Sequence, residues 1–310
     1  MFVEIDEKNS LLGGFEAGGT KFNCVVGKPN GEIISRHLFA TTTPKETFAK
    51  VTNFFRIQGE KYSPIKALGI AHFGPIELNL NSLSYGWLRK TPKPYWSNIN
   101  VLGHFSNSFD IPIAIQTDVN GSAIGERAFG AAKGCNRFAY VTVGTGIGVG
   151  VYSDGKLVQG IDHPEIGHMQ LGNNLGGDEY PGCCPYHHNC LEGLASGTAI
   201  KDRWGVSGNE LEIDHPAWEL EARYLAILCV NLSRFYSPEL IVFGGGVMNQ
   251  IHLIERIREH FILLSNGYLN PKLSERIENY IILSQFNGYA AEKGVLVMAN
   301  KMLDGNKHRI

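Results

Sequence analysis

One pattern of strand, glycine turn, strand and hairpin occurs twice in the chain. The first copy is LLGGFEAGGTKFNCVV with the hairpin PNG, and the second is YVTVGTGIGVGVYSDGKLVQG. The turns correspond in order and with nearly constant spacing: Gly19-Thr20 with Gly144-Thr145, and Asn30-Gly31 with Asp154-Gly155. Two copies are too few for a solenoid, so the repetition predicts two similar α/β domains that face one another across a cleft.

Strands and helices are expected to alternate around these repeats. Helix signals begin at Thr43-Pro44, where Thr is the expected N-cap and Glu46 follows at the third position. Further strands are predicted at 65–71, 111–118, 240–247 and 280–284, and helices at about 44–57, 120–129, 217–236, 250–264 and 290–304. Alternation of this kind predicts an α/β fold. We expect an N-terminal domain over 1–118, a C-terminal domain over 119–289, and a final helix that packs back on the first.

Composition excludes several classes of protein. The 310 residues are 43% hydrophobic, enough for two cores, and 28 basic residues against 30 acidic ones leave a net charge of -2. Such a balance argues against nucleic-acid binding or a polybasic membrane surface. The first residues lack the basic and apolar regions of a signal peptide, and no run reaches the ~18 apolar residues of a membrane span. We therefore expect a cytoplasmic protein.

Three glycine loops point to phosphate binding. Backbone N–H groups at such turns can face anionic oxygens, because glycine allows close approach. The P-loop pattern fails, since Thr20-Lys21 follows Gly19 where Lys and then Ser/Thr is required, and the dinucleotide pattern GxGxxG is also missing. A single loop of this kind is more often an ordinary hairpin turn. Three together favour two domains that hold a nucleotide's phosphates.

Asp118 ends the apolar strand IPIAIQTD just before a predicted helix. Ligands of open α/β sheets bind at the carboxyl ends of strands, and a carboxylate there can accept a proton from a substrate hydroxyl. The alternative is that Asp118 caps the helix that begins near Asn120.

A Cys/His-rich segment over 163–192 is typical of a zinc site. Cys184, His187 and Cys190 lie at tight intervals, and His168 lies upstream, which gives two thiols and two imidazoles. Four such ligands form a closed structural zinc site with no open position for a catalytic water. Cys183 and His188 are competing ligands, and a surface loop without metal is the alternative.

Seven motifs occur in the order found in ROK-family sugar kinases, and the chain most resembles the bacterial zinc-containing fructokinases of that family. The motifs are EAGGTK (16–21), AHFGP (71–75), TDVNGSAIGE (117–126), VTVGTGIGVG (141–150), HPEIGHM (163–169), CPYHHNCLEGLASG (184–197) and IVFGGGV (241–247). The resemblance implies an actin-like (hexokinase/RNase H-like) ATPase fold, which agrees with the duplication.

The resemblance also implies roles for individual residues. Asp118 is the expected catalytic base. Sugar contacts are implied at Gly74, Pro75, Thr117, Glu165, His168 and Glu192, and structural zinc ligands at His168, Cys184, His187 and Cys190. ATP with Mg²⁺ is expected at Glu16, Gly18, Gly19, Thr20, Lys21, Gly144, Thr145, Gly146, Gly244, Gly245 and Gly246. Many members carry Asn where this chain has Thr117, which affects one sugar contact. Many carry Asp where it has Glu16, which affects the magnesium contact.

The expected activity is ATP-dependent phosphorylation of a hexose, with D-fructose converted to fructose 6-phosphate. The alternative is a kinase of the same family whose acceptor is mannose or glucose. A sugar-sensing regulator is a second class, but only about ten residues precede the first strand and no basic helix-turn-helix precedes it. The sugar is the expected partner, with no nucleic acid and no membrane, and the family implies a homodimer.

Overall fold

The computed structural model describes residues 10–171 and 177–303, which form two compact units. Of the described residues, the first unit comprises 10–133, 156–163 and 289–303, and the second comprises 134–155, 164–171 and 177–288. In the described part of the chain, none of the helices combines the length and the apolar composition that a membrane crossing requires.

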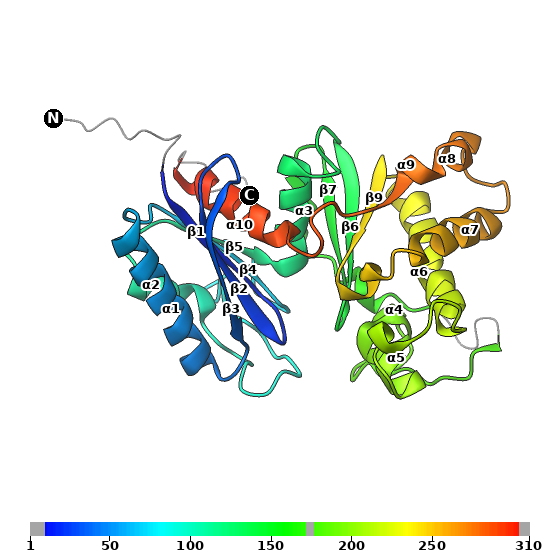
Figure 1. Cartoon of the computed structure of the whole chain (residues 1–310), viewed down its shortest axis with the longest axis horizontal. Helices are drawn as coiled ribbons and strands as arrows, with labels where there is room; N and C mark the ends of the chain where they lie inside the picture. Colours follow the sequence, from blue (N-terminus) through cyan, green and yellow to red (C-terminus); the bar gives the residue numbers. More distant parts are fainter. Residues whose placement is uncertain (1–9, 172–176, 304–310) are drawn as a thin grey trace. The chain divides into compact units, whose positions relative to one another are not determined.

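The first unit is built on a five-stranded sheet with the order β3-β2-β1-β4-β5 (Figure 1). Its strands are β1 (Leu12–Ala17), β2 (Lys21–Gly27), β3 (Ile33–Ala40), β4 (Leu68–His72) and β5 (Ile113–Thr117). The strand β1 is antiparallel to β2 and parallel to β4, which is parallel to β5. The carboxyl ends of β1, β4 and β5 therefore meet at one edge of the sheet.

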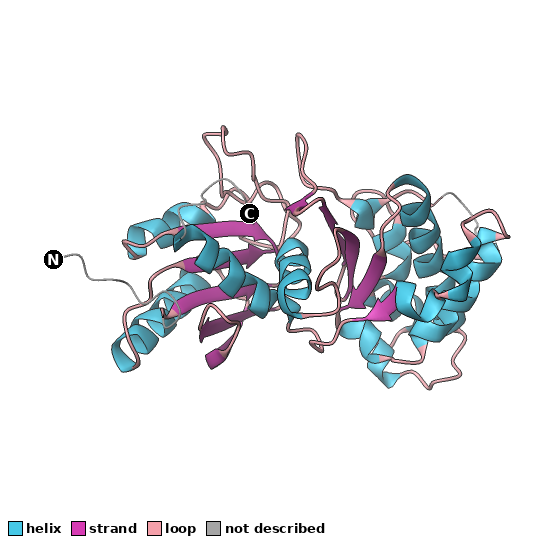
Figure 2. Ribbon diagram, turned by 90° about the horizontal axis from the view of Figure 1, so that it is seen from above, coloured by secondary structure: helices cyan, strands magenta, loops and turns pink. Residues whose placement is uncertain are grey.

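Helices cover both faces of this sheet (Figure 2). The helices are α1 (Pro44–Lys61), α2 (Val101–Ser108), α3 (Asp118–Phe129) and α10 (Ala290–Leu303). Side chains alternate across a strand, so Phe15 packs with α1 and α2 while Leu12 packs with Val295 and Leu296 of α10.

The second unit repeats this plan with the sheet order β10-β9-β6-β7-β8. Its own strands are β6 (Arg137–Val143), β7 (Ile147–Ser153), β9 (Leu240–Gly244) and β10 (Ile281–Leu283). The two-residue edge strand β8 (Lys156–Leu157) lies in a segment grouped with the first unit. As in the first sheet, the central strand β6 is antiparallel to its hairpin partner β7 and parallel to β9. The duplication that the sequence predicts is confirmed.

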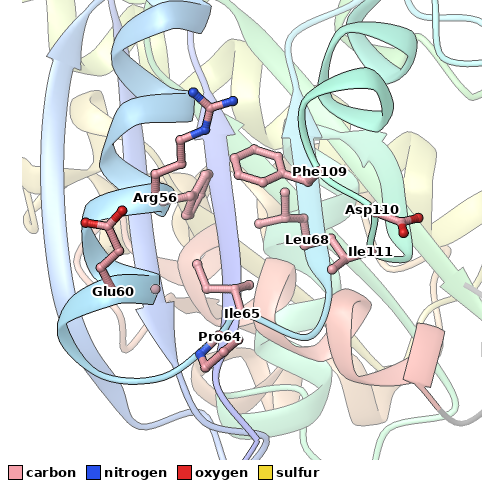
Figure 3. Close-up of a pocket in the computed structure, with 10 residues that line it drawn as sticks. Arg56, Glu60, Pro64, Ile65, Leu68, Phe109, Asp110 and Ile111 are labelled. Carbon is pink, nitrogen blue, oxygen red and sulfur yellow. The ribbon is translucent and has the colours of Figure 1, made fainter.

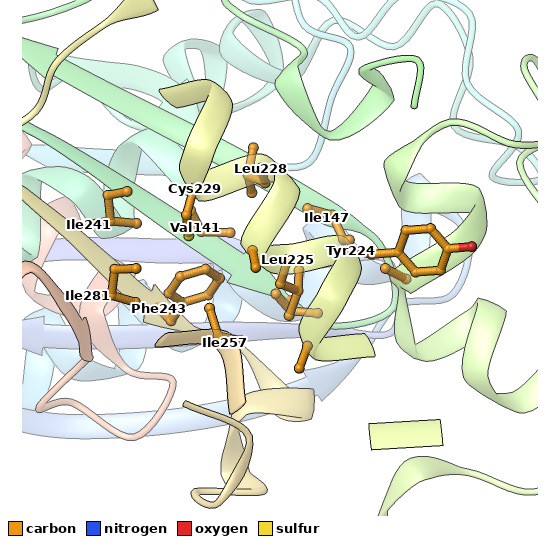
Figure 4. Close-up of a cluster of buried hydrophobic side chains, with 14 of the residues drawn as sticks. Val141, Ile147, Tyr224, Leu225, Leu228, Cys229, Ile241, Phe243, Ile257 and Ile281 are labelled. Carbon is orange, nitrogen blue, oxygen red and sulfur yellow. The ribbon is translucent and has the colours of Figure 1, made fainter. Parts of the chain in front are cut away.

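The core of the second unit lies between its sheet and two long helices, α6 (Ala217–Phe235) and α7 (Leu253–Ser265). Figure 4 shows Leu225, Leu228 and Cys229 of α6 turned toward sheet residues such as Val141 and Phe243. Short helices complete the unit: α4 (Leu191–Ala195), α5 (Gly197–Trp204), α8 (Pro271–Glu275) and α9 (Ile277–Tyr280), with 3-10 turns η2 (Ile166–His168), η4 (Gly208–Glu210) and η5 (Gly246–Asn249).

Most predicted elements are found with shifted ends. Thr43 caps α1 as expected, and the helix continues to Lys61. The strand predicted at 240–247 ends at Gly244, because Gly245 has φ of 92° and turns the chain away. The sequence patterns do not predict the short helices α2, α4 and α5, which the structure contains.

The helix α3 is locked against α10 by glycines. An added Cβ at Gly294 would lie 1.8 Å from the carbonyl oxygen of Gly121, and one at Gly125 would lie 2.0 Å from that of Ala290. Only glycine permits such close backbone approach. Because α3 begins at Asp118, this packing fixes the position of the predicted base, and it extends the first unit beyond residue 118.

Candidate active site and metal cluster

Asp118 is the first residue of α3 and directly follows β5. Its side chain is half-buried, and its Oδ1 accepts a hydrogen bond from the Val119 N–H at 2.8 Å. The helix cap is Thr117 instead, whose Oγ1 accepts from the Asn120 N–H at 3.2 Å. The alternative in which Asp118 caps the helix is therefore wrong, and the hydroxyl oxygen of Thr117 is engaged by the backbone.

Glu16 lies at the end of β1 and faces the same side of the sheet as α10. The amide of Asn23 donates to its Oε2 at 2.8 Å. Desolvation raises the pKa of Glu16 to about 7, and Asp118 and Glu292 add to the rise, while the hydrogen bond from Asn23 opposes it. A carboxyl in this setting gains strongly from a nearby cation.

The first glycine loop joins β1 to β2 as a tight turn. The Gly18 N–H donates to the carbonyl of Lys21 at 2.8 Å, and the Thr41 hydroxyl donates to the carbonyl of Gly18 at 2.8 Å. A Cβ added at Gly19 would meet nothing within 4 Å, and the side chains of Thr20 and Lys21 are exposed. The hydrogen bond from Thr41 therefore holds the turn in place, and the space in the Cβ direction of Gly19 is open.

Gly74 and Pro75 follow β4 and are joined by a cis peptide bond. The N–H of Phe73 donates to the carbonyl of Ala17 at 2.9 Å, and the N–H of Arg89 donates to that of Pro75 at 2.8 Å. This turn therefore belongs to the same sheet edge as the end of β1.

In the second unit, two glycine loops and a helix start lie together. The Gly144 N–H donates to the carbonyl of Gly146 at 2.9 Å, and the Gly197 N–H at the start of α5 donates to that of Gly144 at 2.7 Å. A Cβ at Gly144 would have the backbone nitrogen of Gly246 as its nearest neighbour at 4.0 Å, and one at Gly246 would meet nothing within 4 Å. Gly245 requires glycine, since its φ is positive and a Cβ would lie 2.4 Å from the carbonyl oxygen of Val143. Backbone amides and a helix N-terminus in one place form an environment suited to anions.

The four predicted metal ligands converge in the second unit. The ligand atoms of His168, Cys184, His187 and Cys190 all lie within 4.8 Å of one another. The His168 Nδ1 lies 3.7 Å from Cys184 Sγ and 3.5 Å from Cys190 Sγ, and the His187 Nδ1 lies 3.7 Å from Cys184 Sγ. Tetrahedral zinc with Zn–S of about 2.3 Å and Zn–N of about 2.0–2.1 Å requires S–N separations of about 3.6 Å. The residues fit a zinc ion, and the cluster contains neither Cys183 nor His188.

Glu192 connects the metal cluster to the second glycine loop. It lies in the first turn of α4, and its Oε2 accepts from the Ile147 N–H at 2.9 Å. Its Oε1 lies 3.9 Å from the Nε2 of His168, the nitrogen that faces away from the cluster. Glu165 precedes the η2 turn, and its carbonyl accepts from the His168 N–H at 3.0 Å, so the predicted tight turn between these two residues is present.

Sequence reasoning missed two residues that support the site. Asn23 holds Glu16 from the neighbouring strand, and the Thr198 hydroxyl donates to the carbonyl of Thr145 at 2.7 Å. The register of the β1–β2 hairpin places Asn23 opposite Glu16, and this pairing was the one feature from which the contact could have been predicted. Thr198 carries no comparable signal, because its contact joins distant segments.

A cavity of about 450 Å³ in the first unit lies apart from these residues (Figure 3). Ile65, Leu68, Phe109 and Ile111 line its apolar wall, and Leu68 is the first residue of β4. The cavity is therefore at the amino end of that strand, opposite the edge that carries Asp118, and none of the predicted site residues lines it.

The chain is similar to one protein family along almost its whole length. The model of the ROK family matches residues 12–301. The chain is 42% identical to a fructokinase of Pediococcus pentosaceus, over 94% of this chain and 99% of that protein. It is 41% identical to a fructokinase of Zymomonas mobilis, over 93% and 96%.

Solved structures agree in fold. The ROK hexokinase of Thermus thermophilus superposes with a TM-score of 0.77 at 23% identity, covering 95% of this chain and 99% of that one. A ROK glucokinase of Streptomyces griseus, solved with glucose and AMPPNP, gives 0.74 at 21% identity, covering 94% and 100%. The expected actin-like fold is confirmed, and the chain belongs to the ROK family as a sugar kinase.

Proposed function

We propose that this sugar kinase transfers the γ-phosphoryl group of ATP to D-fructose and forms fructose 6-phosphate. The observation that carries the choice of sugar is the contrast among relatives. Fructokinases match at 41–42% identity over almost the whole chain, whereas a glucokinase of Halalkalibacterium halodurans matches at 24%. Acceptor choice depends on a few hydroxyl contacts, so closer relatives are the better guide.

In this proposal the first unit supplies the base. Asp118 accepts the proton of the acceptor hydroxyl, whose oxygen attacks the γ-phosphorus while ADP departs with the electron pair of the broken bond. Support comes from its half-buried position at the carboxyl end of β5 and from the glycine-locked helix α3 that holds it. A rigid base loses little freedom when substrate binds.

The phosphates of ATP are assigned to the glycine loops of both units. Gly18, Gly19 and Thr20 act in the first unit, and Gly144, Thr145, Gly146 and Gly244–Gly246 act in the second, where Gly197 begins α5. Support comes from the open space above Gly19 and Gly246. Lys21 is assigned a screening role at the phosphates.

Magnesium, when bound, would neutralise phosphate charge and orient the γ-phosphoryl group. Glu16 is the residue assigned to it, directly or through water. The raised pKa of Glu16 supports this role, because desolvation and, to a smaller extent, the charges of Asp118 and Glu292 disfavour its ionised form, and a bound cation would offset them. The longer side chain of Glu, compared with Asp, reaches farther from the strand.

A structural zinc ion, when bound, would hold the imidazole of His168 through Nδ1 and leave Nε2 for a sugar hydroxyl. Glu165 and Glu192 are the proposed acceptors for neighbouring hydroxyls, with Gly74, Pro75 and Thr117 as further sugar contacts. Support comes from the distances within the cluster and from the Nε2 of His168, which faces Glu192. A homodimer and a cytoplasmic location remain predictions.

The experiment is a coupled assay of ADP release across fructose, mannose and glucose, with and without Mg²⁺, followed by ³¹P NMR of the product. We expect fructose to give the highest kcat/KM and the product to be the 6-phosphate. A higher kcat/KM for glucose or mannose would reassign the acceptor. Absence of sugar-dependent ADP release with all three would contradict the kinase activity.

A further inference from the structure

A lysine outside the predicted site reaches the first glycine loop. The Nζ of Lys93 donates a hydrogen bond to the carbonyl of Gly19, although the two residues are far apart in sequence. Lys93 belongs to the segment TPKPYWS, which we call the lysine strap (residues 91–97).

The lysine strap is anchored in the core of the first unit. Trp96 is fully buried, and its Nε1 donates to the carbonyl of Thr42 at 2.8 Å. The Thr91 N–H donates to Ser97 Oγ at 3.1 Å, and that hydroxyl donates back to the Thr91 carbonyl at 3.0 Å. Prolines flank Lys93 on both sides and fix φ at their own positions. The backbone of Lys93 is therefore held in place relative to the loop.

In the described part of the chain, the Lys93 ammonium group has no anionic partner. Within the described residues, no Asp or Glu forms an ion pair with Lys93, and its side chain is half-buried. An ammonium has three donors, and the Gly19 carbonyl uses one of them. The other two lie at a loop whose Gly19 would meet nothing within 4 Å if it carried a Cβ. A fixed, half-buried cation beside open space is suited to an anionic oxygen.

We propose that Lys93 is a further catalytic residue that binds the transferred phosphoryl group of ATP. This inference rests on the proposed function. During transfer the bond from the acceptor oxygen to the γ-phosphorus forms, the bond to the β–γ bridging oxygen breaks, and the hydroxyl proton passes to Asp118. Lys93 keeps its own proton and stabilises the negative charge on the equatorial phosphoryl oxygens.

Lys93→Gln is the informative variant, because it removes the charge and keeps an N–H donor on a side chain that is only one bond shorter. We expect kcat to fall by about 100-fold or more, while KM for fructose stays within about threefold. Lys93→Arg keeps the charge and should recover at least about tenfold of the loss. Lys90→Met is the matched control, since Lys90 is an exposed lysine just before the strap, and should retain wild-type kcat.

Thermal unfolding of each variant separates chemistry from loop structure. The proposal expects Lys93→Gln to keep its Tm within about 2 °C, since the donor is retained. It is overturned if Lys93→Gln keeps kcat within about threefold of wild type, or if Lys93→Arg is as inactive as Lys93→Gln. A rise in fructose KM at unchanged kcat would also overturn it, in favour of a sugar contact. A wild-type chain inactive on every hexose would instead contradict the proposed function, whatever the variants do.

Discussion

His72 should make the first unit sensitive to mild acid. It ends β4, is fully buried, and packs against the rings of Phe22, Phe73 and Trp96 with centroid distances of 5.6, 4.4 and 5.7 Å. Its Nδ1–H donates to the carbonyl of Phe73 at 2.9 Å. Burial lowers the pKa of His72 to about 4, and this hydrogen bond opposes the shift only in part.

The size of the effect follows from proton linkage. An unfolded histidine titrates near pH 6.5, so between about pH 6.5 and 4 the unfolded state binds more protons than the folded one. Stability conferred by neutral His72 is complete above this window and is lost as pH falls through it. With folded and unfolded pKa values of about 4 and 6.5, the loss is about 2 kcal/mol at pH 5 and about 3 kcal/mol at its limit.

The assay is urea unfolding of wild type and His72→Phe, each at about pH 7.5 and pH 5. Other titrating groups are common to both proteins and cancel in the comparison. We expect wild type to lose about 2 kcal/mol more than the variant on acidification. Equal losses in the two proteins would refute the reasoning. A His72 imidazole resonance that titrates near pH 6.5 in the folded protein would do so independently.

Further predictions concern the second unit. Cys184→Ser should lower the measured zinc content from about one ion per chain to nearly none and raise the KM for fructose, whereas Cys183→Ser, outside the cluster, should retain the metal; equal metal content in both would contradict the ligand set. Gly146→Ala would place a Cβ 2.4 Å from the Oε2 of Glu192 and should lower kcat/KM by about tenfold or more, whereas Gly160→Ala, where a Cβ meets nothing within 4 Å, should have little effect; equal kinetics in the two variants would sink this prediction.

The duplicated sheet could be predicted because it rests on local signals. The same glycine turns and apolar strands occur in both copies, and the strands that they predict are found in two sheets of equivalent order. The convergence of Cys184, His187 and Cys190 was also readable, since the three are close in sequence. Thr43 was correctly identified as a cap, because capping depends on residues within one turn.

Contacts between distant segments were beyond sequence reasoning. The hydrogen bond from the Lys93 ammonium to the Gly19 carbonyl depends on how the lysine strap packs around Trp96. The hydrogen bond from the Ile147 N–H to the Glu192 carboxylate similarly depends on where α4 begins. The sequence allows Asp118 as a helix cap. Strand β5 ends one residue earlier than expected, so α3 begins earlier and Thr117 caps it.

The central claim is that Asp118 removes the proton of a sugar hydroxyl during phosphoryl transfer. The most direct measurement compares fructose-dependent ADP release by wild type and Asp118→Asn, with sugar affinity measured by calorimetry on the same samples. We predict a fall in kcat of about 100- to 10,000-fold with fructose affinity and Tm nearly unchanged. An Asp118→Asn chain that turns over fructose at close to the wild-type rate would contradict the account.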